Sequence, residues 1–288
     1  MADQEILVGP EKTAEDSGIL GLNIYGNVGG NVQTVLSYTA TGVVPGALAW
    51  LTGNFTGTEN MGIQIAQPWD NNGTLGLNIY GNVGGTLQPV FTSSDMGQGS
   101  GALAWLTGNF TGTGNDFTEI AQLWDDDGIL GLIVYGIGNG TLETVFTNPN
   151  MSQGSSALAF LAGDFTGSGA TEIAQLWDNN GSLEMIVYGN VGNDNLGTVS
   201  AFPMHQGSSA LAFLTGNFIG SGYTQIAQTR DNNGTLQLLI YGNIGNGSLS
   251  TVFSNDISQI PNALAWVTGD FTGTGNTQIL QPWMTVFG

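Results

Sequence analysis

Short apolar runs alternate with turn-forming residues along the whole chain, and the runs have the two-residue period of β-strands. One segment holds four such runs in succession: residues 102–108, 118–124, 129–136 and 141–147. Because successive side chains of a strand point to opposite faces, we expect Ala102 and Ala104 on one face and Leu103 and Trp105 on the other. No stretch keeps a 3.6-residue period, so we expect almost no helix.

The four runs differ in character, and the differences predict their places in a sheet. The first run has small residues along one face, which is typical of a crowded innermost strand. The sequence Asp125-Asp126-Asp127-Gly128 predicts a tight hairpin turn between the second and third runs, with a Gly that can take a positive φ. The third run is apolar on both faces, as in a sheet that lies between two neighbours. The fourth is more polar and fits an outer edge.

This four-run unit occurs five times, at a spacing of 53 to 55 residues. The first strands begin near Gly46, Gly101, Ser156, Ser209 and Asn262. The second strands lie near Ile65, Ile120, Ile173, Ile226 and Ile279. The third strands end at Tyr25, Tyr80, Tyr135, Tyr188 and Tyr241, and the fourth lie near Val35, Val90, Val145, Val199 and Val252. Repetition at this period predicts a repeat architecture.

We therefore predict an all-β fold, a five-bladed β-propeller with four antiparallel strands per blade, as a single domain over residues 1–288. The two ends are out of phase: residues 19–36 supply a third and fourth strand, and residues 263–283 supply a first and second. The last blade should therefore be closed by both termini, which would remove an exposed edge. Residues 5–8 also resemble a second strand, but residues 278–281 are the favoured occupant of that place.

Charge and composition limit the classes of molecule that could bind this chain. The net charge is −20, because only Lys12 and Arg230 are basic. Nucleic acid and anionic membrane surfaces need clustered basic residues, so neither is expected as a partner. The chain has no Cys, no secretory signal pattern and no apolar run long enough to span a membrane, so we expect a cytoplasmic or non-classically exported protein. The oligomeric state is left open, and a monomer is compatible with the sequence.

Each first strand is followed by a Gly-rich stretch of the form G-[DN]-F-T-G-x-G-x-x-[EQ]-I. This stretch resembles the FG-GAP or VCBS-type repeat, found in integrin α-subunit propellers and in propeller lectins of the Psathyrella velutina and Photorhabdus kind. The resemblance covers essentially the whole chain. It implies a propeller fold, and it leaves the function open because one fold hosts many functions.

The resemblance also implies a calcium site in this stretch, with a pattern like D-x-N-x-D-G-x-x-D. Only Asp164 and Asp270 keep the first acidic position, and Thr, Ser or Ile stand at the third and fifth positions. Calcium needs six to eight oxygen ligands with several carboxylates. We therefore expect an uncharged, hydrogen-bonded turn without calcium, and no other cofactor.

Two sets of loops carry the residues best suited to a ligand, and a propeller places both on one face. The loops between second and third strands hold Trp69, Asp70, Asn71, Trp124, Asp125, Asp126, Trp177, Asp178, Asn179, Asp231, Asn232 and, at the chain end, Trp283. Arg230 replaces the Trp in the fourth copy. The links between blades hold Gln98, Ser100, Gln153, Ser155, Gln206 and Ser208. Aromatic faces pack against the C–H patches of sugars, while Asp, Asn and Gln pair with their hydroxyls.

These residues support a multivalent carbohydrate-binding protein, a lectin with repeated shallow sites between blades and with glycans or glycoconjugates as partners. A second interpretation assigns the Trp residues to the core and the Asp-Asn-Asn-Gly sequences to ordinary hairpin turns. The chain would then be a non-catalytic protein-interaction or adhesion scaffold, or a designed repeat without a natural ligand. We expect no enzyme, because no nucleophile–base pair is visible, Cys is absent and His205 is the only histidine.

Overall fold

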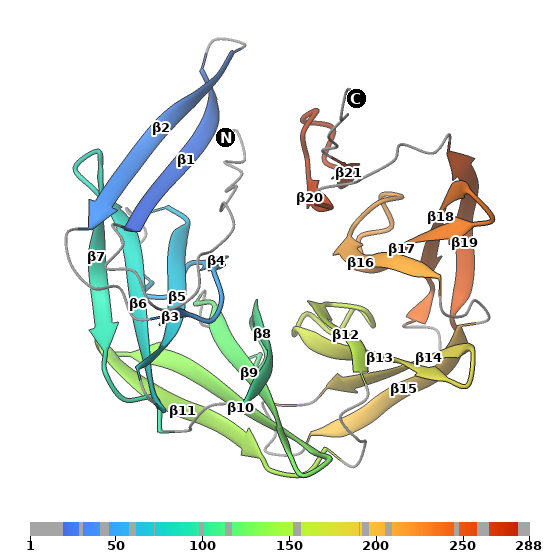
Figure 1. The fold of residues 1–288 in the computed structure, drawn as a ribbon, viewed down its shortest axis with the longest axis horizontal. Coiled ribbons are helices and arrows are strands. Elements are labelled where there is room, and N and C mark those ends of the chain that lie inside the picture. The colour runs from blue at the N-terminus through green and yellow to red at the C-terminus, as the bar shows by residue number, and fades with distance from the viewer. Residues whose placement is uncertain are drawn as a thin grey trace, which may run out of the picture. The chain divides into compact units, whose positions relative to one another are not determined.

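The fold is of the all-β propeller class, with four-stranded antiparallel blades (Figure 1). A computed structural model describes residues 20–28, 31–40, 46–57, 62–71, 73–97, 101–112, 117–151, 157–189, 191, 196–204, 209–244, 248–257 and 265–281. The chain divides into two compact units. Unit 1 comprises Met1–Asn109 and Gly114–Ser152, and unit 2 comprises Phe110–Thr113 and Gln153–Gly288.

In its described residues, unit 1 contains one hairpin and two blades. The hairpin pairs β1 (Leu20–Val28) with β2 (Asn31–Ala40). The first blade consists of β3 (Gly46–Ala47), β4 (Leu51–Gly53), β5 (Gln64–Asn71), β6 (Thr74–Val83) and β7 (Thr86–Ser93). Both β3 and β4 pair with β5, so together they fill the place of a first strand. The second blade consists of β8 (Ala102–Gly108), β9 (Glu119–Asp126), β10 (Ile129–Gly138) and β11 (Thr141–Asn148).

The part of unit 2 that the structure describes contains two blades and one short strand pair. The third blade consists of β12 (Ala157–Gly163), β13 (Glu172–Asn179), β14 (Ser182–Gly189) and β15 (Gly197–Met204). The fourth consists of β16 (Ala210–Gly216), β17 (Gln225–Asn232), β18 (Thr235–Gly242) and β19 (Ser250–Ile257). The pair is β20 (Val267–Gly269) with β21 (Gln278–Leu280). The strand order within each blade follows the chain, as predicted.

The predicted count of five blades is corrected to four, and closure by the two termini is not shown. Among the described residues β1 pairs with β2 and β20 with β21, and no strand pairing joins the two ends of the chain. The two strands of each terminal pair, β1 with β2 and β20 with β21, are neighbours along the chain. Pairing the ends would close the longest loop in the chain, which carries the largest entropic cost. The alternative strand at residues 5–8 lies outside the described residues.

The hairpin between the second and third strands has the conformation that its Asp/Asn-Gly sequence predicts. Asp127, Asn180 and Asn233 have φ near 51–52°, and the Gly that follows each has φ of 87–90°. Two successive residues with positive φ define the type I′ turn, which matches the twist of the paired strands. The turn therefore fixes the register of the second and third strands in each of these blades.

The first strands contain a bulge that changes the predicted alternation of faces. In β8, Ala102 pairs with Trp124 and Ala104 pairs with Leu123, so Leu103 is an extra residue without a partner. The two alanines therefore do not share a face, and this prediction was wrong. An extra residue turns its side chain out of the ladder, and Leu103 is 45% exposed. The same register shift occurs in β12 and β16.

Neighbouring blades within a unit pack face to face, with a hydrophobic core between them. In unit 1 the core includes Leu77 and Ile79 from the first blade and Ile133 and Tyr135 from the second. In unit 2 the corresponding residues are Leu176, Met185 and Val187 from the third blade and Leu239 and Tyr241 from the fourth. This explains why the third strands are apolar on both faces. Figure 1 shows β12 beside β16 in unit 2.

A pair of hydrogen bonds also ties one blade to the next. The backbone N–H of Asn54 donates to Thr118 Oγ1 at 2.9 Å, and the N–H of Thr118 donates to the carbonyl of Asn54 at 2.7 Å. Thr277 and Asn217 form the same pair in unit 2. We call this arrangement the Thr clip.

Candidate functional site

The Asp residues predicted to bind sugar close the hairpin turns. The Oδ1 atoms of Asp70, Asp125, Asp178 and Asp231 accept the backbone N–H of the Gly three residues later, at 2.5–2.7 Å. This is the turn role of Asx residues. Asn71, Asp126 and Asn179 beside them are exposed and Asn232 is half-buried. Asn179 Nδ2 donates to Glu184 Oε1 at 2.7 Å.

The Trp residues of the first two blades lie over glycines of the facing strand. A Cβ placed on Gly76 would be 2.0 Å from the Trp69 ring, and one on Gly131 would be 2.2 Å from the Trp124 ring. Trp69 is only 8% exposed, and Trp124 is half-buried against the core of unit 1. Core packing therefore accounts for Trp69, while an edge of Trp124 stays accessible. In the third blade the half-buried Trp177 pairs with Glu184 in place of a Gly.

The remaining predicted site residues fall outside the described part of the chain. These are Trp283 and the link residues Gln98, Ser100, Gln153, Ser155, Gln206 and Ser208. His205 is also among them.

The fourth blade departs from the Trp–Gly arrangement. Arg230 of β17 takes the Trp position, and Gln237 of β18 pairs with it in place of Gly. Arg230 Nε donates to Gln237 Oε1 at 2.7 Å, and Gln237 Nε2 donates to Asp256 Oδ1 of β19 at 2.8 Å. The Gln237 amide is thus held at both ends, and it fixes the orientation of the guanidinium.

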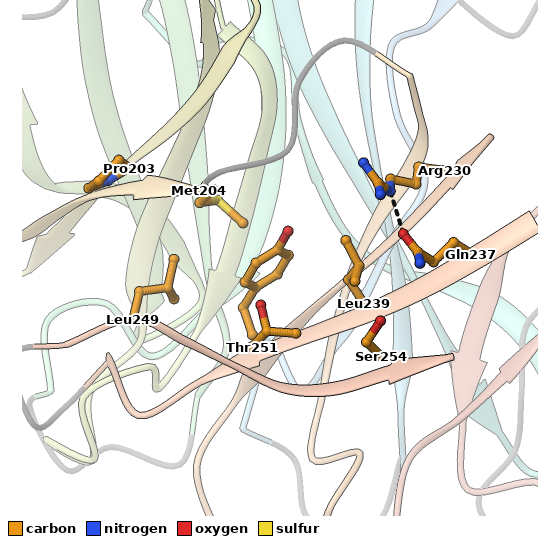
Figure 2. Close-up of a pocket in the computed structure, with 9 residues that line it drawn as sticks. Pro203, Met204, Arg230, Gln237, Leu239, Leu249, Thr251 and Ser254 are labelled. Carbon is orange, nitrogen blue, oxygen red and sulfur yellow. Dashed lines mark hydrogen bonds between the residues drawn. The ribbon is translucent and has the colours of Figure 1, made fainter. Parts of the chain in front are cut away.

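A pocket of about 290 Å³ lies beside this arginine, between the third and fourth blades of unit 2. Its lining residues are Pro203, Met204, Arg230, Gln237, Leu239, Tyr241, Leu249, Thr251 and Ser254. Figure 2 shows Arg230 and Gln237 on one side of the pocket and Pro203 and Leu249 on the other. The pocket therefore has a polar side and an apolar side. Its volume lies near the lower limit of small-molecule sites.

Tyr241, which lines the pocket, is held by a hydrogen bond to Gln228. Tyr241 Oη donates to Gln228 Oε1 at 2.8 Å, and both residues are at most 3% exposed. Burial raises the pKa of Tyr241 to about 12, although the nearby Arg230 acts in the opposite direction. The hydroxyl therefore stays protonated at neutral pH and remains a donor to Gln228.

None of the predicted site residues lines the pocket, and the pocket adds residues that the sequence reasoning missed. Arg230 precedes the loop between the second and third strands, and Met204 precedes the link between blades, so two lining residues border the regions expected to form a site. Gln237, Leu249 and Thr251 were not predicted. The replacement of Trp by Arg at one position of the repeat was the available signal.

The stretch that resembles a calcium loop is a hydrogen-bonded turn in the first, third and fourth copies. Gln64 Oε1 accepts the N–H groups of Phe55 and Thr56, and Gln225 does the same in the fourth copy. In the third copy Glu172 takes this role, with Thr166 Oγ1 as a further donor.

One turn of this kind holds a buried acid. Burial raises the pKa of Glu172, and its bonds to Thr166 and Phe165 oppose that rise. Within the described ranges, no three His, Cys, Asp or Glu side chains are grouped so that they could hold a metal ion. The absence of calcium and of other cofactors stays a prediction.

Comparison with known proteins gives solved structures of low similarity. The chain is similar to rhamnogalacturonan lyase YesW (14% identity, TM-score 0.42), to a Bacillus licheniformis rhamnogalacturonan lyase (14%, 0.40) and to the exotype rhamnogalacturonan lyase YesX (13%, 0.44). Each match covers 83% of this chain, which spans only 57–59% of the length of those structures. No protein-family model and no curated protein matches the chain.

The expectation that the protein is not an enzyme is corrected by this comparison, since the three similar structures are lyases by their titles. The likeness gives no residue of this chain a catalytic role. The FG-GAP or lectin resemblance gains no support from a matching family. In the part of the chain that the structure describes, no helix is long and apolar enough to cross a membrane.

Proposed function

We propose that the protein binds carbohydrate at the pocket between the third and fourth blades. One observation carries the proposal: the pocket combines an apolar side with side-chain donors and acceptors, and two of its lining residues border the loop and the link that were expected to hold a sugar. Pro203 and Leu249 offer surface for the C–H patches of a sugar ring, and Gln237, Thr251 and Ser254 offer partners for hydroxyl groups. A buried hydroxyl needs such partners, so they also provide discrimination.

Multivalent binding stays a prediction. Trp69 is packed over Gly76, so a site in the first blade would have to use other residues. Trp124 and Trp177 are half-buried and each keeps an accessible edge. A weak site at each of these positions would add avidity if several engaged one glycan surface.

A glycan array probed with the full-length chain tests the proposal, and two matched variants locate the site. Ser254 is an exposed residue that lines the pocket, so Ser254→Trp should fill the pocket and abolish retention on the array. Thr147 is exposed and pairs with Ile133 as Ser254 pairs with Leu239, so Thr147→Trp is the control in the second blade. Loss in Ser254→Trp alone would support the pocket. Comparable losses in both variants would favour repeated sites, and a folded protein that binds no glycan would contradict the proposal.

A further inference from the structure

Among the described residues, three hairpin turns carry the dipeptide Asn-Gly at their tips: Asn139-Gly140, Asn180-Gly181 and Asn233-Gly234. Their backbones match, since each Asn has a φ of 52° and each Gly has a φ of 78–90°. Both residues are exposed in all three turns. Asn72 and Asn246 also precede a Gly, and they lie outside the described residues. Any difference in reactivity between the three matched turns must therefore come from their neighbours.

An Asn followed by Gly is chemically labile, because Gly has no Cβ to hinder a ring closure between the two residues. The backbone nitrogen of the Gly attacks the Cγ atom of the Asn, a five-membered succinimide forms, and ammonia leaves. Water then opens the ring at one of its two carbonyl carbons, which gives Asp or isoaspartate. The attacking nitrogen must first lose its proton, so a group that holds the N–H slows the reaction.

An upstream Asp holds this N–H in two of the three turns. The N–H of Gly181 donates to Asp178 Oδ1 at 2.5 Å, and the N–H of Gly234 donates to Asp231 Oδ1 at 2.7 Å. A carboxylate acceptor favours the protonated nitrogen, and its charge repels the amide anion that would attack. Both Asp residues stand two positions before the Asn that they protect.

The turn at Asn139 lacks this protection. Ile137 stands two positions before Asn139, where the other two turns have Asp. In the part of the chain that the structure describes, no side chain accepts the N–H of Gly140. The Asn180 side chain is restrained in addition, because its Nδ2 donates to Asn179 Oδ1 at 3.3 Å.

We propose that Asn139 is a site of spontaneous deamidation, and that Asp178 and Asp231 protect Asn180 and Asn233 from the same reaction. The proposal does not depend on carbohydrate binding. It rests on the contrast between one N–H that is accessible to base and two that are held by carboxylates.

The modification changes the charge and the geometry of the hairpin between β10 and β11. Its product carries one further negative charge, close to an existing one, since a Cβ on Gly138 would be 3.4 Å from Glu143 Oε2. Isoaspartate also lengthens the backbone of the turn by one methylene. Gly138 pairs with Thr141 across this two-residue turn, so the longer backbone should disturb the register there.

Peptide mapping by mass spectrometry, during incubation of the full-length protein at mildly alkaline pH, tests the proposal. We expect Asn139 to convert at least about tenfold faster than Asn180 or Asn233, which corresponds to about 1.4 kcal/mol of activation free energy. A protease that cleaves after aromatic residues isolates Asn139 as the only Asn between Tyr135 and Phe146. An acidic species that accumulates in isoelectric focusing gives an independent readout.

Two variants test the protecting role, and each serves as the control for the other. Asp178→Ala should raise the rate at Asn180, and Asp231→Ala should raise the rate at Asn233, while Asn139 keeps its rate in both. Unchanged Trp fluorescence shows that the variants are folded. In urea the three sites should convert at similar rates, because each Gly N–H then donates to water.

The outcomes are clear-cut. Equal rates at the three sites of the folded protein would overturn the proposal, and so would two alanine variants that convert no faster than the parent. A difference in rate that persists in urea would assign it to the local sequence and would also overturn the role of the turn. A blank glycan array would leave the proposal intact.

Discussion

A buried acid and a buried amide occupy the same place in different copies of the repeat. Glu172 and Gln64 both close the turn after a first strand by accepting two backbone N–H groups. The exposed fraction is 3% for Glu172 and 0% for Gln64. The amide fills the role without a charge to desolvate, whereas the carboxylate must lose its hydration. The turn therefore needs the acceptor and not the charge.

We predict that Glu172→Gln stabilises the protein at neutral pH. Burial raises the pKa of Glu172 in the folded state, so the folded protein favours the protonated acid. Its contribution to stability is complete below the pKa of the unfolded chain and is lost as the pH rises through the higher folded-state pKa. The urea midpoint of the variant should exceed that of the parent at pH 7, and the gap should narrow toward pH 4. Gln64→Glu is the reverse control, and it should be less stable at pH 7 than at acidic pH.

At the scale of elements, the repeat pattern predicts the strands well and the registers only in part. Every predicted second, third and fourth strand is a strand, because alternation and the Asp/Asn-Gly turns are local signals. The bulge at Leu103 was not visible, since Ala102, Leu103 and Ala104 alternate in size as a regular strand does. Local sequence patterns also could not predict whether the two termini pair to form a fifth blade, because that pairing depends on segments at opposite ends of the chain.

In the candidate site, too, local patterns predicted less than the strand registers determine. The sequence predicted none of the lining residues as ligand-binding, and it treated Arg230 only as a replacement for Trp. Gln237 stands opposite Arg230 because β17 and β18 pair in that register, and Leu249 reaches the pocket from the segment before β19. These positions follow from strand pairing and blade packing, which a residue pattern along one strand does not contain.

The Thr clip gives a test of how blades are held together. In Thr118→Val the side chain keeps its shape, but the N–H of Asn54 loses its acceptor. A half-buried donor left without this acceptor should lower the free energy of unfolding by about 1–3 kcal/mol. Thr118→Ser keeps the hydroxyl and should lose less, and Thr277→Val should reproduce the effect in unit 2. Urea unfolding followed by Trp fluorescence measures all three, and equal stability of the Val variant and the parent would show that the clip contributes nothing.

At the scale of the whole molecule, the charge sets how the protein behaves in solution. The chain has 22 acidic and two basic residues, which gives −20 at pH 7 and a pI near 4.1. Mutual repulsion at neutral pH keeps molecules apart, and that repulsion vanishes as the carboxylates take up protons. We therefore predict a solubility minimum close to pH 4 and high solubility at pH 7, measured by turbidity and by the protein left in the supernatant. Arg230→Gln alters only one charge and should leave the minimum in place. A minimum near neutral pH would mean that exposed apolar side chains, such as Leu158 and Leu211, govern association in place of charge.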